Sequence, residues 1–475
     1  MLPVPAPLAY AAAGRSRFLA ELGELIRFPT VSALPRHASD LKRCALWLAG
    51  QLRRSGLERV AVLSTAGHPL VFGEWLHAPG RPTVLVYGHY DVQPVDPLRA
   101  WRFAPFEPTV VGLDLYGRGA SDDKGQLFAH VKALEAYLHS LRRLPVNVKC
   151  LFDGEEEVGS PHLARFVRSH GQLVAADVVL ASDTRFLAKG RPAITYALRG
   201  ALGLEVVVSG PRRDVHSGVY GGAVRNPAET LCEILGSLHG ADGRIAIPGF
   251  YDAVRPVGER ERARMASVAP KDAQILEDAM VARGWGEPGY SLYERTTIRP
   301  AVTVTGITAG YQGEGTKAVI PSKATARIDV RLVPDQDPCE VERLLRRYVV
   351  RVTPPATRVA IRTVLSSRPV TVDRSHPALL AAAAAYRRGF GVPPVLLRLG
   401  GSIPAVGILQ ERVGAPAVLM GFGLPDDGIH APNERFHLPN FYNGIATSIW
   451  FLAEVARRVG ASRRTRLVRL RSVLS

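Results

Sequence analysis

Histidine and acidic side chains gather in five short segments of this 475-residue chain, each of which lies in a predicted loop or directly after a predicted strand. In an open α/β sheet, ligands bind beyond the carboxyl ends of the strands. Side chains that are far apart in the sequence can therefore meet at one site. The segments are residues 88–92 (GHYDV), 117–125 (GRGASDDKG), 153–160 (DGEEEVGS), 181–184 (ASDT) and 429–434 (IHAPNE).

Taken singly, each segment has an ordinary explanation that is at least as common as a metal site. His89 and Asp91 could form a surface pair, residues 117–125 could form a charged turn, and His430 could be a structural histidine. The three glutamates at 155–157 could be the acidic first turn of a helix. However, like charges this close repel one another, and bound cations would relieve that repulsion.

Together the segments supply two histidines and three carboxylates, which form a mixed nitrogen and oxygen ligand set. Such a set suits zinc, and manganese or cobalt less well. Adjacent acids, as at 122 and 123, can give one carboxylate that bridges two metal ions. The four cysteines are widely spaced and form no C-x-x-C pair, so a structural cysteine–zinc site is not expected. The sequence therefore favours a catalytic metal site with an open coordination position.

The elements that must position these segments alternate between strands and helices at both ends of the chain. Short apolar runs predict buried strands, and apolar residues at helical spacing predict amphipathic helices. Their alternation predicts an α/β domain with a mixed sheet. The predicted elements are helices at 18–26, 41–54, 126–141, 377–390 and 441–459 and strands at 83–87, 146–152, 178–181 and 417–420.

The middle of the chain follows another pattern, β-α-β-β-α-β, which is typical of a ferredoxin-like unit. Its strands are predicted at 202–208, 302–307, 325–333 and 359–364, and its helices at 226–238 and 337–350. A long insertion at about 241–300 interrupts it. We therefore expect a first part of a catalytic domain at 1–200, an inserted lid or dimerisation domain at 201–372, and the second part of the catalytic domain at 373–475.

Composition is that of a globular protein, with 47% apolar and 22% charged residues. No apolar run is long enough to predict a transmembrane helix, and residues 1–14 are interpreted as a loose leader without the basic start of a signal peptide.

The cysteines are expected to be buried free thiols in a reducing cytoplasm. The net charge of +17 is expected to reflect a solvated basic surface, with arginines clustered in the tail, and no nucleic-acid or membrane partner is expected.

The order of the motifs resembles the family of zinc-dependent exopeptidases and deacylases. This family includes carnosinase, carboxypeptidase G, acetylornithine deacetylase and succinyl-diaminopimelate desuccinylase, and the sequence is most similar to the carnosinase-like dipeptidase branch. The resemblance covers nearly the whole chain. It rests on G-H-Y-D-V-Q-P with Trp101 after it, G-R-G-x-x-D-x-K-G, E-E-x-G-S, S-D, D-x-H-S-G-x-x-G-G and H-x-P-N-E, in that order.

The resemblance implies a role for each matching residue of a centre with two Zn²⁺ per subunit, for which Mn²⁺ or Co²⁺ are substitutes. His89 and Asp183 are expected to bind one ion, and Glu157 and His430 the other. Asp122 is expected to bridge both ions, with a cis peptide bond to Asp123. Two further residues would act beside the metals: Asp91 would orient His89, and Glu156 would be the general base. Because Glu155, Glu156 and Glu157 are chemically alike, a slip of one residue stays open here.

The resemblance also implies a homodimer and a substrate. His216 is expected to reach the partner's active site and stabilise the oxyanion there. Candidates for holding the substrate's terminal carboxylate are Arg331, Lys317, Arg398, Gly401 and Ser402. By the same resemblance, an aspartate at 183 favours a dipeptidase or an aminopeptidase-like activity on short peptides. The alternatives are a deacylase or amidohydrolase that acts on N-acyl amino acids with the same site, and a scaffolding protein that has lost catalysis.

Overall fold

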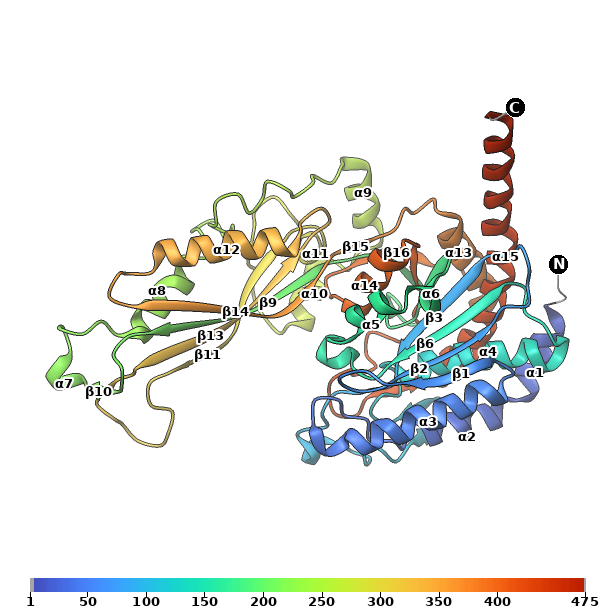
Figure 1. Ribbon diagram of the computed structural model, residues 1–475, viewed down its shortest axis with the longest axis horizontal. Coiled ribbons are helices and arrows are strands. Elements are labelled where there is room, and N and C mark those ends of the chain that lie inside the picture. The colour runs from blue at the N-terminus through green and yellow to red at the C-terminus, as the bar shows by residue number, and fades with distance from the viewer. Residues whose placement is uncertain (1–3, 474–475) are drawn as a thin grey trace. The chain divides into compact units, whose positions relative to one another are not determined.

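The computed structural model describes residues 4–473, with side chains as far as residue 459 (Figure 1). The chain folds into two compact units. Unit 1 contains the chain up to residue 196, residues 372–397 and the chain from residue 408 onward, and unit 2 contains residues 197–371 and 398–407. That these units act as a catalytic domain and a lid stays a prediction.

The largest sheet is mixed, as the sequence predicts, and most of its strands belong to unit 1. Its strand order is β1-β2-β6-β3-β7-β17-β8, with β15 and β16 also paired to β8. Strands β6, β3, β7 and β17 run parallel to one another, so their carboxyl ends meet at one edge. The strands are β1 (Glu58–Leu63), β2 (Leu70–Trp75), β3 (Thr83–His89), β6 (Asn147–Asp153), β7 (Val178–Ala181), β8 (Ala193–Leu198), β15 (Val370–Thr371), β16 (Val395–Leu399) and β17 (Ala417–Leu419).

Helix α4 is the centre of the helical packing in unit 1. It lies against β3 on one side and contacts α1, α2 and α15 on others, which explains why most of its residues are buried. Helix α13 packs along α15. The helices are α1 (Pro5–Ala13), α2 (Arg15–Ile26), α3 (Ala38–Arg54), α4 (Lys124–Leu141), α5 (Leu163–Ser169), α6 (Gly171–Val174), α13 (Pro377–Phe390), α14 (Pro404–Val413) and α15 (Leu438–Val473).

A small antiparallel sheet joins the C-terminal motif to the loop before α4. Strand β18 (Arg435–His437) pairs with β5 (Asp114–Tyr116), which also pairs with β4 (Thr109–Val111). Since β18 directly follows segment 429–434 and β5 directly precedes segment 117–125, this pairing brings the two motifs together. Short 3-10 helices lie at η1 (Pro35–His37), η2 (Leu98–Ala100) and η3 (Glu156–Val158).

Unit 2 contains the predicted ferredoxin-like arrangement. Its antiparallel sheet has the order β11-β13-β9-β14, and α8 and α12 pack on it around a core that includes Val206, Ile328 and Leu345. The chain order of these elements is β-α-β-β-α-β, as expected. They are β9 (Gly200–Ser209), α8 (Pro227–Gly236), β11 (Ala301–Ala309), β13 (Lys323–Leu332), α12 (Pro338–Val352) and β14 (Arg358–Ser367).

The insertion in unit 2 and a second short sheet carry the remaining elements. Helices α9, α10 and α11 lie within the predicted insertion, and β10 pairs with β12 beside α7. Their bounds are α7 (Ser217–Tyr220), α9 (Glu259–Val268), α10 (Asp272–Asp278), α11 (Leu292–Thr297), β10 (Val215–His216) and β12 (Val319–Ile320).

Two predictions from the sequence are wrong. Residues 5–13 form helix α1 and not a loose leader, because Pro5 occupies the first helical position, where proline is tolerated, and Tyr10 Oη donates to Glu135 Oε1 at 3.0 Å. Of the free cysteines only Cys44 and Cys150 are buried. Cys232 and Cys339 are exposed on α8 and α12.

Among the described residues, no helix is long and apolar enough to cross a bilayer.

Candidate active site

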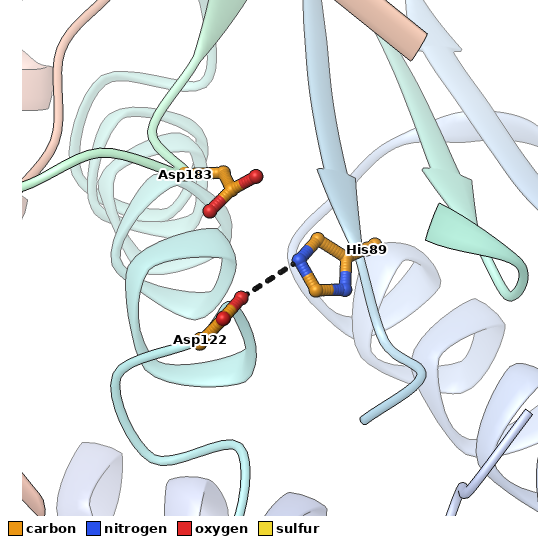
Figure 2. A group of neighbouring side chains, drawn as sticks. All are labelled: His89, Asp122 and Asp183. Atoms are coloured by element: carbon orange, nitrogen blue, oxygen red, sulfur yellow. Dashed lines mark hydrogen bonds and ion pairs between the residues drawn. The ribbon is translucent and has the colours of Figure 1, made fainter. Parts of the chain in front are cut away.

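The first group of potential metal ligands consists of His89, Asp122 and Asp183, whose side chains face one another in Figure 2. His89 ends β3, Asp183 follows the parallel neighbour β7, and Asp122 lies just before α4. One ligand atom from each lies within 4.8 Å of the others, and His89 Nε2 is 3.0 Å from Asp122 Oδ1. The three side chains thus enclose a position that one metal ion could occupy.

The second group consists of Asp122, Glu157 and His430, whose ligand atoms also lie within 4.8 Å of one another. His430 Nε2 is 2.9 Å from Asp122 Oδ2 and 3.3 Å from Glu157 Oε2. Asp122 therefore belongs to both groups and turns one carboxylate oxygen toward each histidine. This is the arrangement that a carboxylate bridging two metal ions requires.

The electrostatics of the two groups favour bound cations. Burial and the charges of Asp122 and Glu156 raise the pKa of Asp183 well above its ordinary value. Burial and Asp122 likewise raise the pKa of Glu157. Burial would also raise the pKa of Asp122, but its hydrogen bonds with His430 and His89 outweigh this and lower it. Carboxylates held this close repel one another, and divalent ions would relieve that cost. The donor set of imidazole and carboxylate fits zinc.

The structure separates the roles of the three consecutive glutamates. Glu155 turns to other partners, because its carboxylate accepts a hydrogen bond from the backbone N–H of His68 at 3.1 Å and lies 2.8 Å from His162 Nδ1. Glu157 faces His430. Burial and the negative charges of Glu157 and Asp122 raise the pKa of Glu156 to about 8. The Glu156 carboxylate therefore senses the charge of ligands from both metal groups.

Asp91 lies beside His89 and also holds the turn that carries the glutamates. His89 Nδ1 is 3.2 Å from the backbone oxygen of Asp91 and 3.4 Å from its carboxylate. The carboxylate oxygens of Asp91 accept hydrogen bonds from the backbone N–H groups of Glu156 and Glu157, each at 3.1 Å. One buried side chain thus links both halves of the candidate site.

Glu434 and Arg118 are site residues that the sequence reasoning did not single out. Glu434 is fully buried, and its Oε2 accepts hydrogen bonds from Arg118 Nη1 at 2.8 Å and from the N–H of Gly119 at 2.9 Å. Its Oε1 accepts from the N–H groups of Ser121 and Asp122, each at 3.0 Å. Glu434 therefore fixes the loop that presents Asp122. Arg118 stands inside the G-R-G motif and Glu434 ends the H-x-P-N-E motif. Neither charged side chain had been assigned a role, and this could have identified both as site residues.

Two further details concern the same loop and its surroundings. The Asp122–Asp123 peptide bond is cis, as the resemblance implied. Gln93, part of the G-H-Y-D-V-Q-P motif, was given no role, yet its Nε2 donates to Glu157 Oε2 at 2.7 Å. Gln93 thus orients one of the candidate ligands from outside the metal groups.

Three of the predicted substrate-binding residues lie together in unit 2: Arg331 on strand β13, and Gly401 and Ser402 in the loop before α14. Arg331 Nη1 donates to Ser402 Oγ at 3.1 Å, and Gly401 next to it is exposed. Arg199, which the sequence reasoning did not select, supports this loop: its Nε donates to the oxygen of Gly400 at 2.8 Å, and its own oxygen accepts from Ser402 Oγ at 2.6 Å. Arg331 also contacts Asp329, with Nε 2.8 Å from Oδ2.

The remaining three predicted residues are not part of this loop contact. His216 is exposed on β10, and its Nδ1 accepts from the N–H of Gly218 at 3.0 Å. Lys317 is exposed in the loop before β12. Arg398 is buried, and its Nε lies 3.1 Å from Glu261 Oε1. The roles of all three stay predictions.

Comparison with known proteins agrees with the resemblance to metal-dependent exopeptidases. The model of peptidase family M20/M25/M40 matches residues 85–453. The chain is 33% identical over 399 residues to a Cys-Gly metallodipeptidase of Schizosaccharomyces pombe, covering 82% of this chain and 83% of the relative.

Solved structures agree with this match. Human carnosine dipeptidase 1 is similar with a TM-score of 0.81 and 30% identity, over 96% of this chain and 100% of the other. A metallo-carboxypeptidase of the M20 family from Sulfolobus solfataricus has a TM-score of 0.83 and 31% identity, over 92% of this chain and 99% of the other. The predicted fold class and the predicted resemblance are confirmed, as is the expectation of a hydrolase of peptide bonds. The chain belongs to peptidase family M20/M25/M40.

Proposed function

We propose that this protein is a dipeptidase that works with two zinc ions. The observation that carries the proposal is the position of Asp122, which faces His89 with one oxygen and His430 with the other. Relatives at 30–33% identity that cover most of the chain are named as dipeptidases for Cys-Gly and for β-Ala-His. The substrate class is therefore taken to be a short peptide with a free carboxylate.

The residues of the two groups would hold the metals. His89 and Asp183 would bind one ion, Glu157 and His430 the other, and Asp122 both. When bound, a pair of divalent ions lowers the pKa of water and polarises the carbonyl that is attacked. Asp91 keeps His89 in place and, through its bonds to the backbone of 156 and 157, fixes the turn that carries the base.

Glu156 is proposed as the general base. Glu155 is held by His162 and Glu157 faces His430, which leaves Glu156 as the glutamate of this turn that can accept a proton and return it. It would accept a proton from the attacking water. It would then deliver that proton to the nitrogen of the leaving amine when the C–N bond breaks.

Arg331 and Ser402 are proposed to bind the substrate's terminal carboxylate. The guanidinium of arginine matches a carboxylate with two parallel hydrogen bonds. Arg331 is held by Asp329 and Ser402, which lowers the entropy lost when it binds a ligand. Gly401 and Lys317 are exposed in unit 2 and are further candidates for this contact.

A homodimer and a cytoplasmic location complete the proposal. His216 is exposed at the start of α7, which is consistent with a role in the active site of a partner subunit. Such a histidine would donate a hydrogen bond to the oxyanion formed during peptide hydrolysis. Sedimentation of the active protein tests the dimer, and a fully active monomer would contradict it.

The experiment that tests the function measures hydrolysis of a panel of dipeptides and N-acyl amino acids by the purified protein. Each substrate is assayed with zinc, with manganese and with a chelator. Dipeptide cleavage that the chelator abolishes and zinc restores is the expected result. Cleavage of N-acyl amino acids alone would move the protein to the deacylases. Dipeptide cleavage that survives complete metal removal would refute the metal-dependent reaction.

A further inference from the structure

A cavity in unit 1 lies where the C-terminal half of α13 meets α15. Its volume is about 460 Å³, which is within the range of small-molecule sites. None of its residues is a candidate metal ligand or belongs to the proposed catalytic residues. The walls are Leu380, Ala383, Ala384, Arg387, Arg388, Pro393, Pro394, Glu454, Arg457 and Arg458.

The cavity has an excess of positive charge. Four of its side chains are arginines and one is a glutamate, Glu454, whose carboxylate is almost fully buried. That carboxylate is shared, with Oε2 at 2.6 Å from Arg457 Nη2 and 3.0 Å from Arg458 Nε, and Oε1 at 3.8 Å from Arg388 Nε. One negative charge thus faces three arginines, and Arg387 has no ion-pair partner within the described part of the chain.

The arginines are held in position before any ligand arrives. Glu454 fixes Arg457 and Arg458 with hydrogen bonds, and the guanidinium of Arg388 lies over the Trp450 ring, 4.4 Å from its centroid. Ordering flexible arginines in advance reduces the entropy that binding would cost. The same side chains stay accessible, since Arg388 and Arg457 are about half exposed (52% and 46%).

We propose that this cavity binds a small polyanion that carries at least two phosphate groups. Planar guanidinium groups form paired hydrogen bonds to phosphate oxygens, and several arginines can divide two or more phosphates between them. A single carboxylate ligand would leave much of the charge unmatched. The apolar wall formed by Leu380, Ala383 and Pro394 offers a surface for the less polar part of a phosphorylated molecule.

The test measures binding of pyrophosphate and ATP to the full-length protein by titration calorimetry at constant ionic strength. Binding of both assigns the site to the diphosphate group alone, and binding of ATP only assigns it to a nucleotide. The matched variant is Arg387→Gln combined with Arg457→Gln, which removes two charges and keeps Glu454 partnered by Arg458. The dissociation constant of the variant is expected to rise at least about tenfold, because two charge-assisted contacts are lost.

Two controls keep the outcome clear. Pyrophosphate and ATP also chelate divalent ions, but the variant retains every candidate metal ligand, so any effect on the metal centre is equal in both proteins. A second variant replaces the tail arginines 463, 464, 466, 469 and 471 by glutamine and is expected to bind like the wild type. Equal binding by the cavity variant and the wild type would overturn the proposal. So would loss of binding in the tail variant, or binding to DNA or anionic vesicles without binding to pyrophosphate.

Discussion

Replacing Glu434 by glutamine tests whether this buried carboxylate positions the bridging ligand. Its two oxygens accept four hydrogen bonds, from Arg118, Gly119, Ser121 and Asp122. A glutamine has nearly the same shape but only one oxygen, so its NH₂ group must face two donors. Whichever way the amide turns, two buried donors lose their acceptor.

The size of the effect follows from that count. A buried donor without a partner costs about 1–3 kcal/mol, so two cost about 2–6 kcal/mol of unfolding free energy. Whole domains have about 5–15 kcal/mol, and the loss is therefore measurable. Because two of the donors are the backbone groups of Ser121 and Asp122, the bridging carboxylate should also shift. Residues that orient metal ligands typically change metal affinity about 10–100-fold when they are replaced.

Asp427→Asn is a matched control on the same loop. Asp427 Oδ2 accepts from Ser121 Oγ at 2.6 Å and from the N–H of Leu424 at 2.7 Å, while Oδ1 is buried and has no hydrogen-bond partner. An asparagine can keep its oxygen at the Oδ2 position and retain both bonds. Burial raises the pKa of Asp427 to about 7, so the neutral amide resembles a form that the wild type already populates.

The assay compares urea unfolding of the two metal-free variants and their zinc affinity by competition with a chelator. Glu434→Gln should lose at least about 2 kcal/mol of unfolding free energy and bind zinc at least about tenfold more weakly. Asp427→Asn keeps both hydrogen bonds at the Oδ2 position, so it should lose less unfolding free energy than Glu434→Gln and bind zinc like the wild type. If both variants behave alike, Glu434 does not position Asp122 in the way described.

Three further predictions concern the proposed base, the pH dependence of stability and the proposed contact with the substrate carboxylate. Glu156→Gln should lower kcat by about 100-fold or more while zinc analysis shows full metal content, and Glu155→Gln should lower it less; equal losses would refute Glu156 as the base. In the metal-free protein, hydrogen bonds to Asp122 and Glu157 raise the pKa of His430 from 6.5 to about 10, so its stabilising effect is complete below pH 6.5 and is lost toward pH 10. Burial raises the pKa of Glu156 from 4.5 to about 8, which also removes stability as the pH rises between these values. The melting temperature of the metal-free protein should therefore fall from pH 5 to pH 9 more steeply than that of the zinc-bound protein, and equal slopes would contradict this. Arg331→Ala should raise KM for a dipeptide by at least about tenfold and leave a dipeptide amide unaffected, since only the former carries the carboxylate; equal effects on both substrates would exclude that contact.

Several elements could be predicted because their signals are local. The predicted strand 178–181 and helix 377–390 coincide with β7 and α13. Pro377 suits a first helical turn, and Gly391 ends that helix with a positive φ of 77°. Helix α9 was missed because Met265 is its only buried residue, so the sequence has no apolar stripe to recognise. The short apolar strand β8 was also missed, although it is fully buried in the sheet.

The sequence by itself determined which residue types could bind metal and the order of strands and helices that carries them. Both depend on residue identity and local spacing, which a linear chain displays directly. Only the tertiary structure decided that Glu155 turns toward His162 and that Glu157 faces His430. It also decided that Glu434 holds the loop of Asp122, and that arginines of α13 and α15 line one cavity. Apart from the pair Glu155–His162, which are seven positions apart, these contacts join residues dozens to hundreds of positions apart. They therefore depend on how the strands pair and the helices pack.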